Sequence, residues 1–132
     1  MGAWGMKPFE NDSACDWIYD LQESGLKIIE DTFTWEKEEE YLDSSFGTEI
    51  IAAAEVLYGI KNGPRESVPD EVLTEIRKYE SNQVEYLYSK CIKAIERVTG
   101  EDSELFDLWE ETGEDFEIWL NDVKKLKAGL MR

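Results

Sequence analysis

Apolar residues recur every three or four positions along most of the chain, which is the spacing of one face of an α-helix. The longest such run begins after Ser81 and ends at Gly100. No stretch alternates apolar and polar residues with comparable strength, as a half-buried β-strand does. The pattern therefore predicts an all-α protein, a compact bundle of five to seven helices in a single domain over residues 1–132. Five apolar residues on helix faces are expected to be buried: Leu87, Cys91, Ile95, Trp119 and Val123.

Capping residues and turn formers mark where several helices begin and end. A first helix is expected near 12–24, since Gly25 follows its last turn and candidate N-caps precede it, namely Asn11, Asp12 and Ser13. Residues 26–35 fit either a short strand or a helix, and we favour the helix. A short helix near the carboxyl end is expected to start at a cap formed by Asp102 or Ser103.

Three further helices follow from the same signals. An apolar stripe that starts at Thr48 and continues to Asn62 predicts a central buried helix. Pro69 is expected at the first helical position of the next helix, whose apolar positions extend to Tyr79. Thr112 is expected to open the last helix through a capping box.

Composition excludes most familiar kinds of active site. The 132 residues include no His, which removes Ser/His/Asp and Cys/His triads and every zinc site that needs imidazole. Cys15 and Cys91 have no CxxC partner and are expected to be free thiols. The chain contains no phosphate-binding glycine motif and no calcium-loop motif. We therefore expect no enzyme activity, no cofactor and no metal; acid/base catalysis by paired carboxylates is a weaker alternative.

The charge balance indicates the kind of partner. Lys and Arg number 14 while Asp and Glu number 31, which gives a net charge of -17. This balance argues against contact with nucleic-acid phosphates or anionic lipid, and a basic protein is its natural complement. The longest apolar stretch, Ile50–Ala54, is far shorter than the roughly 20 residues that cross a bilayer. No secretory signal is recognisable at the start, so we expect a cytoplasmic protein.

Acidic residues gather near the carboxyl end. Residues 101–122 contain ten acids and no basic residue. Like charges one turn apart destabilise a helix slightly, so folding alone does not explain this concentration. Two interpretations stay open: a solvated face that confers solubility, or a negative patch that binds a basic partner. The residues predicted to bind the partner are Asp107, Trp109, Glu110, Glu111, Glu114, Asp115 and Glu117.

The opening of the chain carries a distinctive motif. Met1–Gly5 has the sequence M-G-A-W-G, and Pro8–Ala14 has the sequence P-F-E-N-D-S-A. This opening resembles the amino-terminal signature of the bacterial family called domain of unknown function 4259, although Met6-Lys7 replaces the family's usual Thr-Gly. Ser103–Glu110 and Trp119-Leu120 resemble its carboxy-terminal pattern. The resemblance implies a small bacterial cytoplasmic protein and brings no established reaction.

Trp4 stands between two glycines in this motif, which predicts an indole anchored in the core by a tight backbone. The alternative is a binding site formed by Trp4, Phe9, Asn11 and Asp12.

Size, charge and the lack of catalytic residues favour a non-enzymatic binding protein. Its most concrete form is an immunity protein that inhibits a basic bacterial toxin, such as a nuclease, by placing negative charge where phosphates would lie. The alternative is a small housekeeping or stress-related domain whose acidity serves solubility only.

Overall fold

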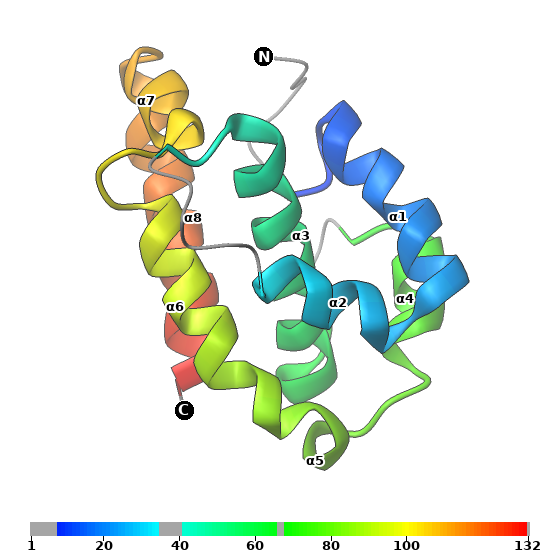
Figure 1. Cartoon of the computed structure of the whole chain (residues 1–132). Helices are drawn as coiled ribbons and strands as arrows, with labels where there is room; N and C mark the ends of the chain where they lie inside the picture. Colours follow the sequence, from blue (N-terminus) through cyan, green and yellow to red (C-terminus); the bar gives the residue numbers. More distant parts are fainter. Residues whose placement is uncertain (1–7, 35–40, 66–67, 132) are drawn as a thin grey trace.

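The chain folds into helices joined by short turns and loops (Figure 1). The computed structural model describes residues 8–34, 41–65 and 68–131. The elements in chain order are α1 (Asp12–Ser24), α2 (Leu26–Phe33), α3 (Ser44–Asn62), α4 (Asp70–Ile76), α5 (Ser81–Val84), the 3-10 turn η1 (Glu85–Leu87), α6 (Tyr88–Val98), α7 (Glu104–Glu110) and α8 (Glu114–Met131). Within those ranges there is no strand, and the predicted all-α bundle is confirmed; it has seven helices when the continuous Ser81–Val98 run is counted as one.

Helix α3 is the centre of the bundle. It contacts each of the other α-helices in the described part of the chain, and buried side chains lie on all of its sides. A helix enclosed in this way needs small residues where its neighbours approach closely, and Ala52, Ala53 and Ala54 are fully buried. The sequence placed its start at Thr48, but the helix begins at Ser44 because the Asp43 side chain accepts a hydrogen bond from the Phe46 N–H, 3.0 Å away.

The first two helices form as the local signals predict. The Asn11 side chain caps α1 by accepting from the N–H of Ala14 at 2.8 Å. Gly25 ends α1 with φ at 58°, a left-handed conformation that glycine adopts without strain. Of the expected range 26–35, residues 26–33 are helical, as favoured, and Trp35 lies outside the described residues. The Trp17 indole donates to the Thr32 hydroxyl at 3.1 Å and joins α1 to α2.

Two predicted helix starts are wrong in detail. Pro69 is the N-cap of α4, one residue before the first helical position, and α4 ends at Ile76 so that Tyr79 follows it. Thr112 is not at the N-cap position of α8, because the helix begins at Glu114; its hydroxyl donates to the Trp109 carbonyl at the end of the preceding helix, 2.6 Å away. Ser103, one of the two expected caps, is the N-cap of the short helix α7, which begins at Glu104.

The predicted core is confirmed. Leu87, Cys91, Ile95, Trp119 and Val123 are all buried. The 3-10 turn η1 interrupts the long apolar run, yet Val84, Leu87 and Cys91 still point inward together. Phe9 is buried and Asn11 is engaged in capping, while Trp4 lies outside the described residues.

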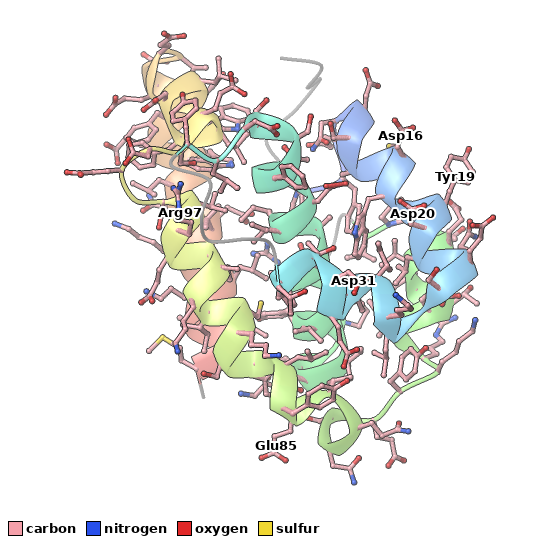
Figure 2. All side chains as sticks on the ribbon, viewed as in Figure 1. Asp16, Tyr19, Asp20, Asp31, Glu85 and Arg97 are labelled. Carbon is pink, nitrogen blue, oxygen red and sulfur yellow. The ribbon has the colours of Figure 1, made fainter. Side chains whose placement is uncertain are left out.

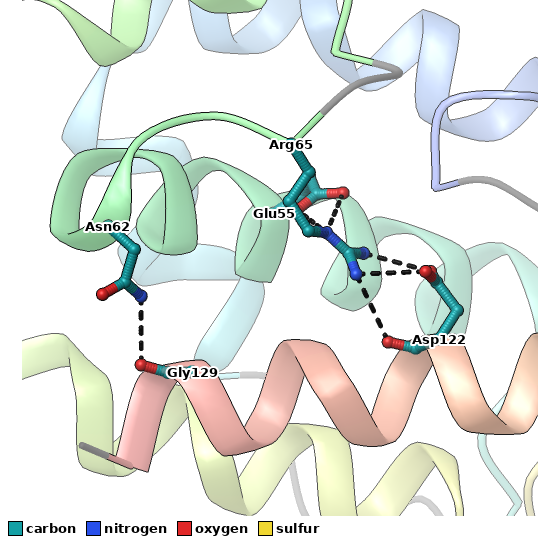
Figure 3. A network of polar contacts seen from close by, with 5 residues as sticks. All are labelled: Glu55, Asn62, Arg65, Asp122 and Gly129. Atoms are coloured by element: carbon teal, nitrogen blue, oxygen red, sulfur yellow. Dashed lines mark hydrogen bonds and ion pairs between the residues drawn. The ribbon is translucent and has the colours of Figure 1, made fainter.

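An ion triad built on the buried Glu55 joins α3 to α8 (Figure 3). Glu55 is only 2 % exposed, and both of its carboxylate oxygens accept from the Nε of Arg65, at 3.1 and 2.9 Å. The two terminal nitrogens of Arg65 bond the two carboxylate oxygens of Asp122 in α8, each at 3.0 Å. Desolvation opposes the Arg65 charge, but the two carboxylates outweigh it and raise the pKa of Arg65. The guanidinium therefore stays charged and links the loop after α3 to both helices.

Side chains of α3 also hold the end of α8. Asn62 donates to the carbonyl of Gly129 at 3.1 Å, and Lys61 donates to the carbonyl of Leu130 at 3.0 Å. Carbonyls in the last turn of a helix have no partner within the helix, and a cation there also suits the helix dipole. Gly129 presses its backbone against the Tyr58 ring, where a β-carbon would collide with the ring.

The core assignment predicts different effects for two isoleucines. Ile95→Ala should lower the free energy of unfolding by about 2–5 kcal/mol because it leaves a cavity in the core. The same substitution at Ile118, which is 54 % exposed, should change it by less than about 0.5 kcal/mol. Urea denaturation midpoints measure both variants. Equal midpoints would show that the inner faces of α6 and α8 are misassigned.

The ion triad predicts non-additive substitutions. Arg65→Met should lower the free energy of unfolding by about 3–5 kcal/mol because it leaves the Glu55 charge buried without its counter-ion. The double variant Arg65→Met/Glu55→Met removes that buried charge and should be more stable than the Arg65→Met single variant. A denaturation series on the two single variants and the double variant tests this. Simple addition of the two single effects would contradict the account.

Candidate functional site

The acidic end of the chain is fixed to the central helix by hydrogen bonds. Leu42 and Ser103 form an isolated bridge, in which the N–H of Leu42 donates to the Asp102 carbonyl at 2.8 Å. The Glu104 side chain accepts from the N–H of Ser44 at 2.7 Å, at the first residue of α3. Ser103 caps α7 by accepting from the N–H of Phe106. These contacts set the position of α7 relative to α3.

Aromatic side chains fill the space between α7 and α8. The rings of Trp109 and Trp119 stack with centroids 5.9 Å apart and an interplanar angle of 12°. Phe106 and Phe116 meet edge to face at 5.2 Å. Packed aromatic pairs stabilise beyond the area that they bury, so the turn between the two helices is held firmly.

The structure corrects one predicted site residue. Trp109 was expected beside the acids on the surface, but it is 7 % exposed and belongs to the core between α7 and α8. Its indole supports the acidic surface from beneath and is not available to a partner. The position of α8, whose Trp119 ring stacks on the indole, decides that the face of α7 that carries Trp109 is covered.

The other six predicted residues are all exposed around the turn between α7 and α8. We call this surface the α7–α8 corner; it consists of Asp107, Glu110, Glu111, Glu114, Asp115 and Glu117. Within the part of the chain that the structure describes, none of the six is in an ion pair with Lys or Arg. By contrast, Glu104 and Asp122, from the same acidic segment, serve the fold as a helix cap and an ion-pair partner.

Two exposed apolar side chains at the corner were missed from the sequence. The hydroxyl of Tyr41 donates to the Asp107 carboxylate at 3.0 Å, although the two residues are far apart in the chain. Loss of water around this hydroxyl and the bond to Asp107 raise the pKa of Tyr41, so it remains a neutral donor. Ile118 projects from the first turns of α8 and is 54 % exposed. Helical spacing could have predicted that Ile118 lies outside the apolar stripe of α8. It could not have predicted that Tyr41 lies beside Asp107, because the two residues are far apart in the chain.

A second acidic surface lies on α1 (Figure 2). Asp16, Asp20 and Glu23 are exposed there and follow helical spacing, with Tyr19 among them at 69 % exposure. This surface is at the other side of the bundle from α7 in Figure 1. It resembles the corner in chemistry and provides a natural comparison in experiments.

The buried polar groups have structural roles. Glu55 and Glu75 are buried acids, and each has a cation within bonding distance, Arg65 at 2.9 Å and Lys78 at 2.7 Å. Burial raises the pKa of both free thiols, at Cys15 and at Cys91, and keeps them protonated. Among the described residues, no group of three or more Cys, Asp or Glu side chains is arranged to hold a metal ion.

Glu49 is half-buried, and its environment differs from that of Glu55 and Glu75, since carboxylates lie near it. Desolvation and the nearby carboxylates of Asp20 and Asp43 raise its pKa. It borders a small cavity of 210 Å³ that is lined mainly by Ile28, Thr32 and Phe46. Asp31 lines the same cavity and is in an ion pair with Lys27 at 3.2 Å.

Comparison with known proteins identifies one family. The family model described as Domain of unknown function (DUF4259) matches residues 2–122. Searches of curated proteins and of solved structures found no match. Over the described residues, no helix has the length and hydropathy needed to cross a membrane.

Proposed function

We propose that this chain, which belongs to the family described as domain of unknown function 4259, is a non-enzymatic module that binds and neutralises a basic protein. The observation that carries this proposal is the α7–α8 corner, where exposed carboxylates have no basic partner among the described residues. The most concrete partner is a bacterial toxin, such as a nuclease, and the protein would act as its immunity protein in the cytoplasm.

The rigidity of the corner supports a binding role. Carboxylates that are free to move would lose conformational freedom when a partner orders them, which weakens association. Here the stacked Trp109 and Trp119 rings and the cap at Ser103 hold the backbone under the acids. The negative field is therefore formed before the partner arrives, and such a field accelerates encounter with a positive surface.

The corner also offers apolar contact. Interfaces take most of their binding energy from a few large side chains surrounded by polar ones. Tyr41 and Ile118 are exposed next to the acids and replace Trp109 in that role. A nuclease that binds phosphates has a basic surface of the kind that this combination complements. If acidity serves solubility only, as in a housekeeping or stress-related domain, neither the carboxylates nor these side chains should affect any partner.

A matched pair of charge variants tests the proposal. The corner variant Asp107→Asn/Glu110→Gln/Glu111→Gln/Glu114→Gln removes four exposed charges from the corner. The control variant Asp16→Asn/Asp20→Asn/Glu23→Gln/Glu85→Gln removes four exposed charges elsewhere. Both have the same net charge, so a difference between them reports position and not total charge.

We expect the corner variant to associate with the partner about tenfold more slowly at low salt, while the control keeps most of the wild-type rate. The partner is isolated by affinity capture from the native host and its identity checked against the neighbouring genes. Stopped-flow association at several salt concentrations then measures the rates, since screening at roughly 8 Å near physiological salt suppresses steering. Circular dichroism should show unchanged helix content in both variants.

The remaining outcomes contradict this account in different ways. If only the control variant loses binding, the α1 surface is the interface. If both variants bind and protect as well as the wild type, the acids serve solubility and the housekeeping alternative holds.

A further inference from the structure

A cavity of 460 Å³ lies where α2, α3 and α6 meet. Its floor is apolar: Phe33 from α2 and Ile50 from α3 are buried core residues, and Ala94 lies beside them on α6. Cavities of this size are typical of small-molecule sites, which combine an apolar lining with a few polar groups. The chain contains room for a ligand that carries a small hydrophobic body.

The rim of this cavity is basic in a strongly acidic protein. Lys90, Lys93 and Arg97 line it from α6, where spacings of three and four residues place them on one side of the helix. Lys90 and Lys93 are exposed, and neither is in an ion pair with any described acid. Lys124 and Lys125 on α8 are likewise exposed without an ion pair to a described acid, but they do not line this cavity; Lys90 and Lys93 differ from them in lying beside an apolar floor.

Arg97, the third cation of the rim, is bonded to the backbone, unlike the two lysines. A terminal nitrogen of Arg97 donates to the carbonyls of Glu101 and Asp102, each at 2.9 Å (Figure 2 marks the residue). Its guanidinium is thus directed toward the turn before α7 and adds positive charge to the rim. Thr32 is also committed, since its hydroxyl donates to the Ile28 carbonyl at 2.7 Å and accepts from Trp17. The two lysine ammonium groups are the donors that can move to a ligand.

We propose that this cavity binds a small amphipathic carboxylate, with the anionic group between Lys90 and Lys93 and an aromatic or short acyl body on Phe33 and Ile50. Lysine ammonium groups act as mobile point charges and suit a single carboxylate. A dianion such as a phosphate is often bound by a planar guanidinium through two parallel hydrogen bonds, and the Arg97 guanidinium on this rim is already bonded to backbone carbonyls. The apolar floor adds affinity for an apolar body through the hydrophobic effect. It would not increase the affinity for a small hydrated anion. This site is separate from the α7–α8 corner and does not depend on the proposed function.

The test uses 4-phenylbutyrate as the probe and follows amide signals in ¹H–¹⁵N spectra of the full chain. We expect saturable shifts at Thr32, Phe33 and Ala94. The neutral analogue 4-phenylbutanol should bind about fivefold more weakly, because exposed ion pairs each contribute modestly. Acetate, which has the charge without the ring, should cause no saturable shift.

Two double variants separate local from overall charge. Lys90→Ala/Lys93→Ala should weaken 4-phenylbutyrate binding about fivefold. Lys124→Ala/Lys125→Ala removes two exposed lysines from α8 instead and should leave binding unchanged. Equal weakening by both variants would assign the effect to net charge and overturn the site. Equal affinity for the acid and the alcohol, or no saturable shift at these residues, would overturn it as well.

Discussion

The side chain of Glu55 is buried on the central helix α3, and its bonds to Arg65 are the interaction on which the bundle depends. An isolated charge in the core is strongly unfavourable. Removal of the Arg65 guanidinium would leave the Glu55 carboxylate without its counter-ion and would lower the stability of the fold. Arg65 also joins two helices, because its other two nitrogens donate hydrogen bonds to Asp122 and fix α8 against α3. Lys61 and Asn62 secure the far end of α8, so this helix is attached at two levels.

The acids of the chain divide into those that support the fold and those that face solvent. Asp43 and Glu104 bond backbone N–H groups at the start of α3, while Asp122 completes the triad. The carboxylates of the α7–α8 corner have no such role, and their mutual repulsion slightly opposes folding. The stacked Trp109 and Trp119 rings beneath them offset that repulsion. A surface of this kind is stable in the absence of a partner and already has the shape in which it would meet one.

The two proposed sites have opposite charges and lie on different helices, the cavity between α2, α3 and α6 and the corner on α7 and α8. The lysine rim lies where α2 approaches α6, and the acidic corner lies beyond the carboxyl end of α6. Fields from exposed charges fall off within about 8 Å at physiological salt, so two such regions can coexist on a small domain. The net charge of -17 therefore describes the whole chain but not each surface.

The sequence by itself determined the helices, several of their ends and the inner faces that form the core. Asn11 and Gly25 act on the backbone within a few residues, and the stripe through Leu87 and Ile95 depends only on helical spacing. The six corner acids are exposed, as is usual for charged side chains, but the burial of Glu55 and Glu75 shows that charge alone does not decide exposure. Contacts between residues far apart in the chain were decided by tertiary structure: the burial of Trp109, the partner of Glu55, the bond between Tyr41 and Asp107, and the cavity beneath Lys90 and Lys93. Local spacing sets which side of a helix is apolar, but which neighbour covers that side, and what gap it leaves, is set only when all the helices pack together.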